Sequence, residues 1–313
     1  MEQDKIVVIM GGTSTEAEVS RRTGKAILEA LRSKGYHAEG MELAPKTFAS
    51  DIQKTGCRIV FNALHGKYGE DGLVQGTLDM LEIPYTGSGV LAAAVTMDKA
   101  ASKRVFQAEG ISTPRSHTYR SYEMKRGLTA EIEGEFSYPV VVKAASQGSS
   151  IGVHIVEERG ALEQALKDAF RYNDEVLVEE FIRGRELTVA VWGNAETKEA
   201  FPIIEITTTS GRYDYASKYT KGASAHIVPA PLSEAKTREI QDLAVKAFTA
   251  CGCCGVARVD MMLSEDETPY VIEVNSVPGM TETSLVPDAG RAMGIEFPEL
   301  CERILEMAGY PVK

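Results

Sequence analysis

The chain has 313 residues, which at about 150 residues per domain suggests two domains and admits three. Its 43% of hydrophobic residues is ordinary for a folded protein, and a chain this long needs neither disulfides nor a structural metal to fold. The 34 basic and 45 acidic residues give a formal net charge of −11, which argues against nucleic acid as the main partner because duplex binding needs a basic field.

Targeting and anchoring segments are not expected. The start, MEQDKIVVIMGG, has no basic stretch before a long apolar run, and the end, YPVK, has no terminal cysteine motif. The most apolar stretch, GVLAAAVTM, falls far short of the ~20 residues of a membrane helix. Five cysteines, an odd number, indicate reduced thiols in the cytoplasm. Cys251 and Cys254 have C-x-x-C spacing, but without a second ligand pair we expect small thiols at a helix-to-strand turn.

The first section of the chain predicts a layer of parallel strands and helices. Ile6–Met10 is strand-like, and after a glycine pair an amphipathic helix with Ser14 as its N-cap runs to about residue 34. A second strand is expected at 59–64 and a helix at 72–81. Because ligands gather at the carboxyl ends of strands in such layers, the glycine pair and the turn at His65 mark one side of an expected site.

Two mixed sections follow. The second begins near Asp98 with a helix to about Gly110 and continues with strands at 140–143, 153–156 and 175–179 and a helix at 158–171. The third begins near Gly184 and contains strand runs at 187–192 and 201–206, a helix near 233–250, a hairpin at 256–275 and two closing helices. Its polar stretch from Thr207 to Ala225 is too long for an ordinary loop and is typical of a lid.

The hairpin carries the most informative side chains. If it is symmetric about the centre of its SEDET turn, Asp260 faces Glu273 and Arg258 faces Asn275, and all four lie on one face. Two carboxylates and an amide make an all-oxygen site suited to one or two Mg²⁺ ions, as at phosphoryl-transfer sites. Arg258 would neutralise a transferring phosphate or an oxyanion. An exposed hairpin with a cross-strand ion pair fits the same residues equally well.

A strand ending in Lys143 precedes the loop SQGSSIG, whose small residues would let backbone N–H groups converge on phosphate oxygens. The loop does not match the P-loop pattern, and on its own a plain turn explains it better. Lys143 adds weight, because a lysine inside a sheet needs an anionic partner. Lys99 is less telling, since a lysine at a helix start is readily solvated. The stretch EEFIRGRE, 179–186, fits an adenine and ribose site, with an ordinary charged linker as the default interpretation.

Other residues are ambiguous at this level. His65 fits a hydrogen bond to a substrate or a structural cap. After the hairpin, the N–H of Gly279 could point at a ligand. Ser284 is the expected N-cap of the next helix, whose N-terminus could hold a carboxylate, although simple capping explains it as well. Trp192, inside a strand, is expected in the core.

In combination these segments resemble the D-alanine–D-alanine ligases, an ATP-grasp family of bacterial cell-wall enzymes. The matching stretches occur in family order over nearly the whole chain: GGTSTEAEVS, ALHGKYGEDGLVQG, IPYTGSGVLAAAVTMDKAASK, YPVVVKAASQGSSIGV, VEEFIRGRELTVAV, YDYASKYTKG, GVARVDMM and IEVNSVPGMTETSLVP. The resemblance implies an α/β protein of three-domain ATP-grasp architecture. Its parts would be an N-terminal parallel α/β domain at 1–97, a small central α+β domain at 98–183, and a C-terminal α+β domain at 184–313 that carries the metal site and the lid.

The resemblance also implies the reaction and its requirements. One D-alanine carboxylate would attack the γ-phosphate of ATP to give an acyl phosphate, and the amine of a second D-alanine would displace phosphate. ATP and two Mg²⁺ or Mn²⁺ ions would be needed, and a requirement for a monovalent cation is left open. The expected partners are D-alanine and a second copy of the chain in a homodimer, without nucleic acid or membrane, in the bacterial cytoplasm.

Site residues carry over by motif. The implied metal ligands are Asp260, Glu273 and Asn275. The implied ATP-binding residues are Lys99, Lys143, Ser149, Ser150, Glu179, Glu180, Ile182, Glu186 and Lys218. The implied catalytic residues are Glu16, Ser149, Tyr219, Arg258 and Gly279. The implied substrate-binding residues are Glu16, His65, Tyr213, Ser284 and Leu285.

Tyr219 bears on the choice of substrate. The related D-alanine–D-lactate ligases generally carry histidine in this lid region, where a protonated imidazole would repel an ammonium nucleophile. Tyr219 therefore favours dipeptide formation, while tolerance for D-serine or D-lactate stays open. A different ATP-grasp carboxylate–amine ligase would share much of this pattern, but the EAEVS and SLVP stretches argue against it. A non-catalytic nucleotide-binding protein would be expected to lack a metal ligand or Arg258, and the chain retains all of them.

Overall fold

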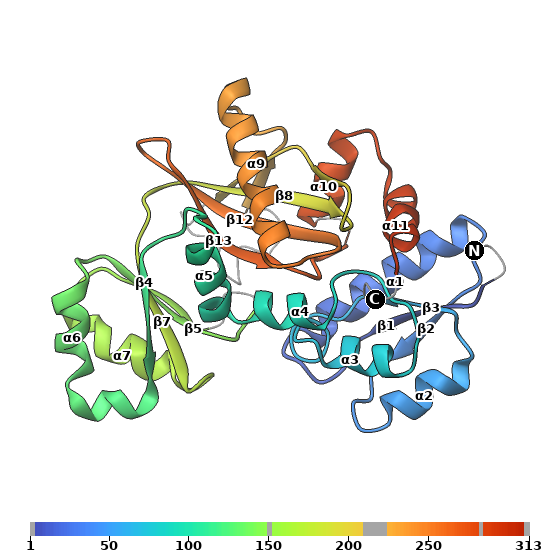
Figure 1. Cartoon of the computed structure of the whole chain (residues 1–313), viewed down its shortest axis with the longest axis horizontal. Coiled ribbons are helices and arrows are strands. Elements are labelled where there is room, and N and C mark those ends of the chain that lie inside the picture. Colours follow the sequence, from blue (N-terminus) through green and yellow to red (C-terminus); the bar gives the residue numbers. More distant parts are fainter. Residues whose placement is uncertain (1–3, 149–151, 209–223, 282–283, 310–313) are drawn as a thin grey trace.

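The structure is a computed structural model that describes residues 4–148, 152–208, 224–281 and 284–309 (Figure 1). In the view of Figure 1, a three-stranded layer lies at the right, a four-stranded sheet at the left, and a larger sheet above them. Helices α4 and α5 lie in the centre, where both contact strand β13 of the larger sheet.

The first unit is a parallel sheet in the order β2-β1-β3 with helices on both faces. Its elements are β1 (Ile6–Met10), α1 (Ala17–Ser33), β2 (Ala38–Glu42), α2 (Phe48–Thr55), β3 (Ile59–Asn62), α3 (Leu73–Met80) and α4 (Val90–Met97). Every residue of β1 is buried. Its even-numbered residues face the core that contains α1, and Val7 and Ile9 face the core of α2 and α3. A continuous apolar run is what a strand covered on both faces requires.

The second unit is an antiparallel sheet in the order β4-β7-β5-β6. Its elements are α5 (Lys99–Ala108), β4 (Ser116–Arg120), the 3-10 helix η1 (Ser121–Arg126), α6 (Leu128–Glu135), β5 (Val140–Ala144), β6 (Val153–Val156), α7 (Arg159–Ala169) and β7 (Glu175–Glu180). Apolar residues of α6 and α7 pack against β4, β5 and β7 to form its core.

The third unit is a sheet in the order β11-β10-β8-β12-β13, with β9 also paired to β8. Its elements are β8 (Gly184–Gly193), β9 (Lys198–Ala200), β10 (Ile204–Thr208), β11 (Ser224–Ile227), α9 (Glu234–Ala250), β12 (Gly255–Ser264), β13 (Pro269–Asn275), α10 (Leu285–Ala292) and α11 (Phe297–Glu306). Helix α9 covers one face. Helices α10 and α11 join a core shared with α1 and β1, so the end of the chain packs against its beginning. Trp192 belongs to this shared core, as predicted.

Several predicted boundaries were wrong. Helix α1 begins at Ala17, with Glu16 at the N-cap position. The Ser14 hydroxyl instead accepts from the Glu16 N–H (3.2 Å) and donates to the His65 carbonyl (2.7 Å), so it ties the helix start to the next turn of the layer. The strand expected at 201–206 begins only at Ile204, and Phe201 lies before it in the core. The ends of the expected lid stretch are paired strands, β10 and β11, and 209–223 lie outside the described residues.

The hairpin register was predicted correctly where it matters for the site. Asp260 pairs with Glu273 and Arg258 with Asn275. The symmetric register fails beyond that point, because Met261 pairs with Val271 and leaves one extra residue on β13. Such a bulge bends a strand locally and is common beside active sites.

The cysteines behave as structural thiols. All five are free, and Cys251, Cys253 and Cys254 lie in the turn between α9 and β12. Burial raises the pKa of the Cys251 thiol to about 12, so it stays protonated at neutral pH.

Among the described helices, none has the length and apolar character needed to span a bilayer.

Candidate active site

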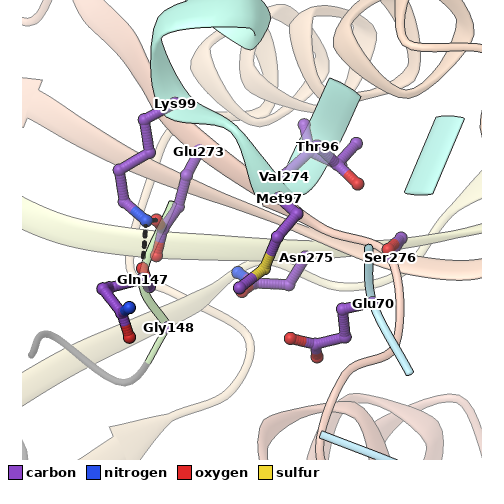
Figure 2. Close-up of a pocket in the computed structure, with 10 residues that line it drawn as sticks. All are labelled: Glu70, Thr96, Met97, Lys99, Gln147, Gly148, Glu273, Val274, Asn275 and Ser276. Carbon is purple, nitrogen blue, oxygen red and sulfur yellow. Dashed lines mark hydrogen bonds and ion pairs between the residues drawn. The ribbon is translucent and has the colours of Figure 1, made fainter. Parts of the chain in front are cut away.

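A pocket lies where the three units meet (Figure 2). It is lined from the first unit by the turn after β3 and the end of α4, from the second by the start of α5 and the loop after β5, and from the third by β13 and the residue that follows it. The lining residues are Glu70, Thr96, Met97, Lys99, Gln147, Gly148, Glu273, Val274, Asn275 and Ser276. Three of the ATP and metal residues predicted from the sequence, Lys99, Glu273 and Asn275, therefore share one cavity.

Asp260 is the most firmly held acid of the hairpin face. Arg258 donates from Nε to its Oδ1 and from Nη2 to its Oδ2, both at 2.7 Å. Asn275 donates its amide N–H to Oδ2 (2.9 Å), and the buried Thr188 donates its hydroxyl to Oδ1 (2.6 Å). A bidentate guanidinium and two further donors fix the position of the carboxylate. The expected cluster of acid, amide and arginine is thus present on one face.

Lys99 contacts the second acid of this face. Its Nζ lies 3.1 Å from Glu273 Oε2 and donates to the Gln147 carbonyl at 2.6 Å, as Figure 2 shows. Only 11% of the Lys99 side chain is exposed, so it is not the solvated lysine that a helix start also allowed. The loop after β5 is held to the same helix by Asp98, which caps α5 through the Ala101 N–H (2.8 Å) and accepts from Ser146 Oγ (3.1 Å).

The side chains of Asp260, Glu273 and Asn275 fit a magnesium site that substrate phosphates complete. Within the described ranges, no three His, Cys, Asp or Glu side chains converge as they would in a site built from protein ligands alone. Asp260, Glu273 and Asn275 instead offer two carboxylates and an amide. Mg²⁺ commonly takes one or two carboxylates and completes its shell with water and substrate phosphates. The residues present therefore suit an ion that arrives with a nucleotide.

Lys143 has the anionic partner that its buried position demands. It forms an ion pair with Glu179 Oε1, and the other oxygen of Glu179 lies 2.7 Å from Lys103 Nζ. Burial alone would raise the pKa of the Glu179 carboxyl, but the two ammonium groups together hold the pKa below its usual value. Lys103 was not predicted as a site residue, although its spacing of four from Lys99 places both on one face of a helix.

The side chain of Glu179 is turned toward these lysines and is only 2% exposed. Its predicted part in adenine binding therefore stays a prediction. Glu180 is the last residue of β7, where its Oε1 accepts from the Arg115 N–H (2.8 Å), and Ile182 lies in the connection to β8. Glu186 lies in β8, paired with Ile206 and Met262.

On the side of the first unit, Glu16 is 8% exposed. A Cβ placed on Gly148 would lie 2.7 Å from Glu16 Oε2, and one placed on Gly66 would lie 3.0 Å from it. The carboxylate of Glu16 thus fits between a turn of the first unit and the loop of the second. Only glycine leaves it this room on the Gly148 side.

His65 is buried next to Glu16 in this turn, at 5% exposure. Its Nε2 lies 3.1 Å from Thr23 Oγ1, and its Nδ1 lies 3.7 Å from Glu70 Oε1. Glu70 also accepts from the Gly66 N–H (3.0 Å) and lines the pocket. Sequence reasoning missed Glu70. Its only signal was an acid in the GEDG stretch that follows the strand end.

The segment after the hairpin matches the prediction in part. Ser284 occupies the N-cap position of α10, but its hydroxyl accepts from the Thr281 N–H (3.0 Å) and makes no cap bond to the helix. A Cβ on Gly279 would lie 3.1 Å from Ser284 Oγ, so a larger residue would crowd this turn. The side chain of Leu285 is in the core at 5% exposure. The predicted Ser149, Ser150, Tyr213, Lys218 and Tyr219 lie outside the described residues.

Comparison with known proteins finds one family over nearly the whole chain. Residues 39–88 match the family described as D-ala D-ala ligase N-terminus, and residues 105–306 match D-ala D-ala ligase C-terminus. A D-alanine–D-alanine ligase of Syntrophotalea carbinolica is 48% identical over 305 residues, covering 97% of this chain and 96% of the relative. One of Pelotomaculum thermopropionicum is 46% identical, again covering 97% of this chain and 96% of the relative.

Solved structures show the same fold. The D-alanine–D-alanine ligase of Bacillus anthracis, complexed with ATP, superimposes with a TM-score of 0.85 at 34% identity, covering 97% of both chains. The VanG D-Ala:D-Ser ligase of Enterococcus faecalis gives a TM-score of 0.83 at 29% identity, covering 97% of this chain and 99% of that one. The three sheets described above therefore form the ATP-grasp architecture. On these matches, the chain belongs to the D-alanine–D-alanine ligase family.

Proposed function

We propose that the protein is an ATP-dependent ligase that joins two molecules of D-alanine into D-alanyl-D-alanine, for the synthesis of peptidoglycan precursors. The observation that carries this proposal is the shared pocket. It places Lys99, Glu273 and Asn275, suited to a nucleotide phosphate and its metal, in the same cavity as Glu70 and beside Glu16 on the first unit. The substrates of this pocket are inferred from family membership, which covers nearly the whole chain.

In the first step, an oxygen of the first D-alanine carboxylate forms a bond to the γ-phosphorus, and the bond from that phosphorus to ADP breaks. The phosphoryl group carries negative charge throughout, so fixed cations stabilise the transfer. Lys99, Lys143 and Lys218 hold the phosphates. Ser149 and Ser150 contribute from the loop after β5. Adenine and ribose bind along the 179–186 connection, at Glu179, Glu180, Ile182 and Glu186.

In the second step, the amine of the second D-alanine forms a bond to the acyl carbon, loses a proton, and phosphate leaves with its bridging oxygen. Arg258 and the N–H of Gly279 stabilise the oxyanion. Glu16 binds the ammonium of the first D-alanine. The remaining substrate contacts fall to His65, Tyr213, Ser284 and Leu285, and closure over the site falls to Ser149 and Tyr219. Exclusion of water protects the acyl phosphate from hydrolysis.

Two Mg²⁺ or Mn²⁺ ions held by Asp260, Glu273 and Asn275 would neutralise phosphate charge when bound. In the structure, Arg258 pairs with Asp260 and Lys99 with Glu273. Both proposed carboxylate ligands are thus held in place by cations that also have proposed roles in the reaction.

The route through an acyl phosphate is tested with D-alanine labelled with ¹⁸O in its carboxylate. The proposed bond changes transfer one labelled oxygen from each first-site D-alanine to inorganic phosphate. Mass analysis of the released phosphate measures this. Label found in AMP instead, with pyrophosphate released, would show activation through an adenylate and contradict the proposed first step.

Gly148→Ala is expected to lower kcat/KM for D-alanine about 10-fold while leaving the melting temperature nearly unchanged. The new Cβ would sit 2.7 Å from the Glu16 carboxylate, which has to move from its place at the ammonium of the first D-alanine. Because the clash involves the end of a side chain, the fold tolerates it. Gly134→Ala in α6, where nothing lies within 4 Å of an added Cβ, is the matched control. Equal kinetics in the two variants would remove Glu16 from the amino-acid site.

The expected homodimer has support on the outer surface of the first unit. The packed helices α3 and α4 expose Leu73 (54%), Met80 (87%), Val90 (40%) and Leu91 (77%). Exposed apolar side chains gathered in one area are typical of a surface covered by a partner.

Leu91→Lys is expected to shift the protein from dimer to monomer in light scattering after size exclusion. Tyr122→Lys, at an exposed apolar side chain of the second unit, is the control. A wild-type monomer at micromolar concentration would contradict the dimer.

We place the protein in the cytoplasm. Its five cysteines are free thiols, as is usual where glutathione keeps thiols reduced. The proposed reaction uses ATP and D-alanine, which is consistent with the cytoplasm.

A further inference from the structure

Lys143 and Lys103 both pair with Glu179 but differ in how close they lie to the pocket. Lys143 Nζ and Lys103 Nζ each pair with one oxygen of the carboxylate, and the exposed fractions of the three side chains are 9%, 3% and 2% for Lys143, Lys103 and Glu179. Lys103 also donates to the Pro114 carbonyl at 3.0 Å. It is enclosed by protein groups, whereas Lys143 is the second-last residue of β5, the strand that precedes the loop reaching the pocket.

This group of three carries more positive than negative charge. Two buried ammonium groups form ion pairs with a single carboxylate, while Glu180 acts on Lys103 from a greater distance. A net buried cation is costly unless an anion completes it. If Glu179 had Lys143 as its only partner, the two charges would cancel and Lys143 would attract phosphate weakly. With Lys103 on the second oxygen, Glu179 is already paired, and Lys143 keeps charge for an incoming anion.

The position of Lys103 on its helix supports the same assignment. Lys99 and Lys103 lie one turn apart on α5, and Lys99 reaches into the pocket while Lys103 is buried behind it against β7. Burial lowers the pKa of the Lys103 ammonium, and Glu179 opposes this shift. A neutral side chain at this buried position would avoid the cost of desolvating an ammonium, so the charge of Lys103 points to a role.

We propose that Lys103 is a positioning residue for ATP: by holding one oxygen of Glu179, it orients the carboxylate and leaves Lys143 both fixed in place and charged toward the nucleotide phosphates. This inference rests on the proposed function, since it takes Lys143 as a phosphate-binding residue. It does not require that D-alanine be the amino acid.

The test measures the binding of adenosine, ADP and ATP, each with Mg²⁺, by isothermal titration calorimetry on the full chain without amino acids. In Lys103→Met, the Kd values for ADP and ATP are expected to rise about 10-fold more than the Kd for adenosine, which reports any change that Glu179 causes on the adenine side. Steady-state kinetics are expected to show a higher KM for ATP and an unchanged KM for D-alanine. Lys246→Met, which removes an exposed lysine bonded to the Gly110 carbonyl, is the control.

A merely structural lysine gives a different result. The melting temperature of Lys103→Met would fall, but the Kd for ATP of the folded protein would match the wild type, and this outcome would overturn the proposal. If Lys103→Met does not fold, Lys103→Gln, which keeps a donor toward Glu179 but removes the charge, takes its place. A rise in the Kd for ATP that exceeds the rise in the Kd for adenosine supports the positioning role, and wild-type affinity for ATP overturns it.

The binding experiment also separates this inference from the proposed function. A wild-type protein that binds ATP but does not turn over D-alanine would refute the ligase assignment and leave the comparison of Lys103→Met with wild type fully informative. A wild-type protein that turns over D-alanine while Lys103→Met keeps its affinity for ATP would refute only the positioning role.

Discussion

Glu273→Gln is expected to lower kcat/KM by about 10²- to 10³-fold, in line with the loss of one preorganised charged group from a transition-state site. Gln keeps the shape of the side chain but removes a negative charge from a site with two carboxylates. It also takes away the partner of Lys99, whose Nζ lies 3.1 Å from the Glu273 carboxylate. The defect should grow as Mg²⁺ is lowered, which is measured as turnover across a Mg²⁺ titration.

The matched control is Glu265→Gln in the hairpin turn, which makes the same chemical change at an exposed position of the same hairpin. Its activity is expected to equal that of the wild type. Thermal unfolding of both variants checks that the sheet is intact. A Glu273→Gln protein with wild-type activity at low Mg²⁺ would remove Glu273 from the proposed metal site.

Arg258→Ala is expected to have an effect of similar size, about 10²- to 10³-fold in kcat, because the loss of one preorganised donor to an oxyanion costs about this much. The loss should appear mainly in kcat, since the proposed role lies in the transition state rather than in binding of the ground state. Steady-state kinetics with ATP and D-alanine varied separately measure the split.

Arg258→Lys distinguishes charge from geometry. Lysine keeps a cation near Asp260 but cannot make the two parallel bonds that Arg258 donates to that carboxylate at 2.7 Å. We expect activity between those of Arg258→Ala and the wild type. Full activity of Arg258→Ala in a folded protein would mean that the arginine only supports Asp260 and takes no part in the reaction.

The hairpin shows how far local sequence rules reach. Alternation along a strand placed Asp260, Glu273, Arg258 and Asn275 on one face, and the structure confirms it. The bulge beside this pair could not be predicted, because an extra residue changes the register without changing the hydrophobic pattern of either strand on its own. Strand β2 was missed for a related reason: only its first residue is buried, so it has no apolar alternation to detect.

The residues missed at the site are those whose meaning depends on distant parts of the chain. Lys103 looks like a solvated helical lysine until β7 brings Glu179 next to it. Glu70 looks like a loop acid until it lies beside His65 and in the pocket. The packing of α10 and α11 onto the first unit is likewise a long-range contact that no local pattern carries. The domain boundaries at 98 and 184 stay a prediction.

The substrate is the claim on which the rest of the account depends, and release of phosphate from ATP and Mg²⁺ tests it most directly. The amino acids supplied are D-alanine alone, D-alanine with D-serine, D-alanine with D-lactate, and L-alanine, with the products identified by mass. We predict turnover with D-alanine alone, giving D-alanyl-D-alanine, and none with L-alanine. Phosphate release only when D-serine or D-lactate is added would contradict the proposed second substrate, and silence in every mixture by a protein that binds ATP would contradict the assignment as a D-alanine ligase.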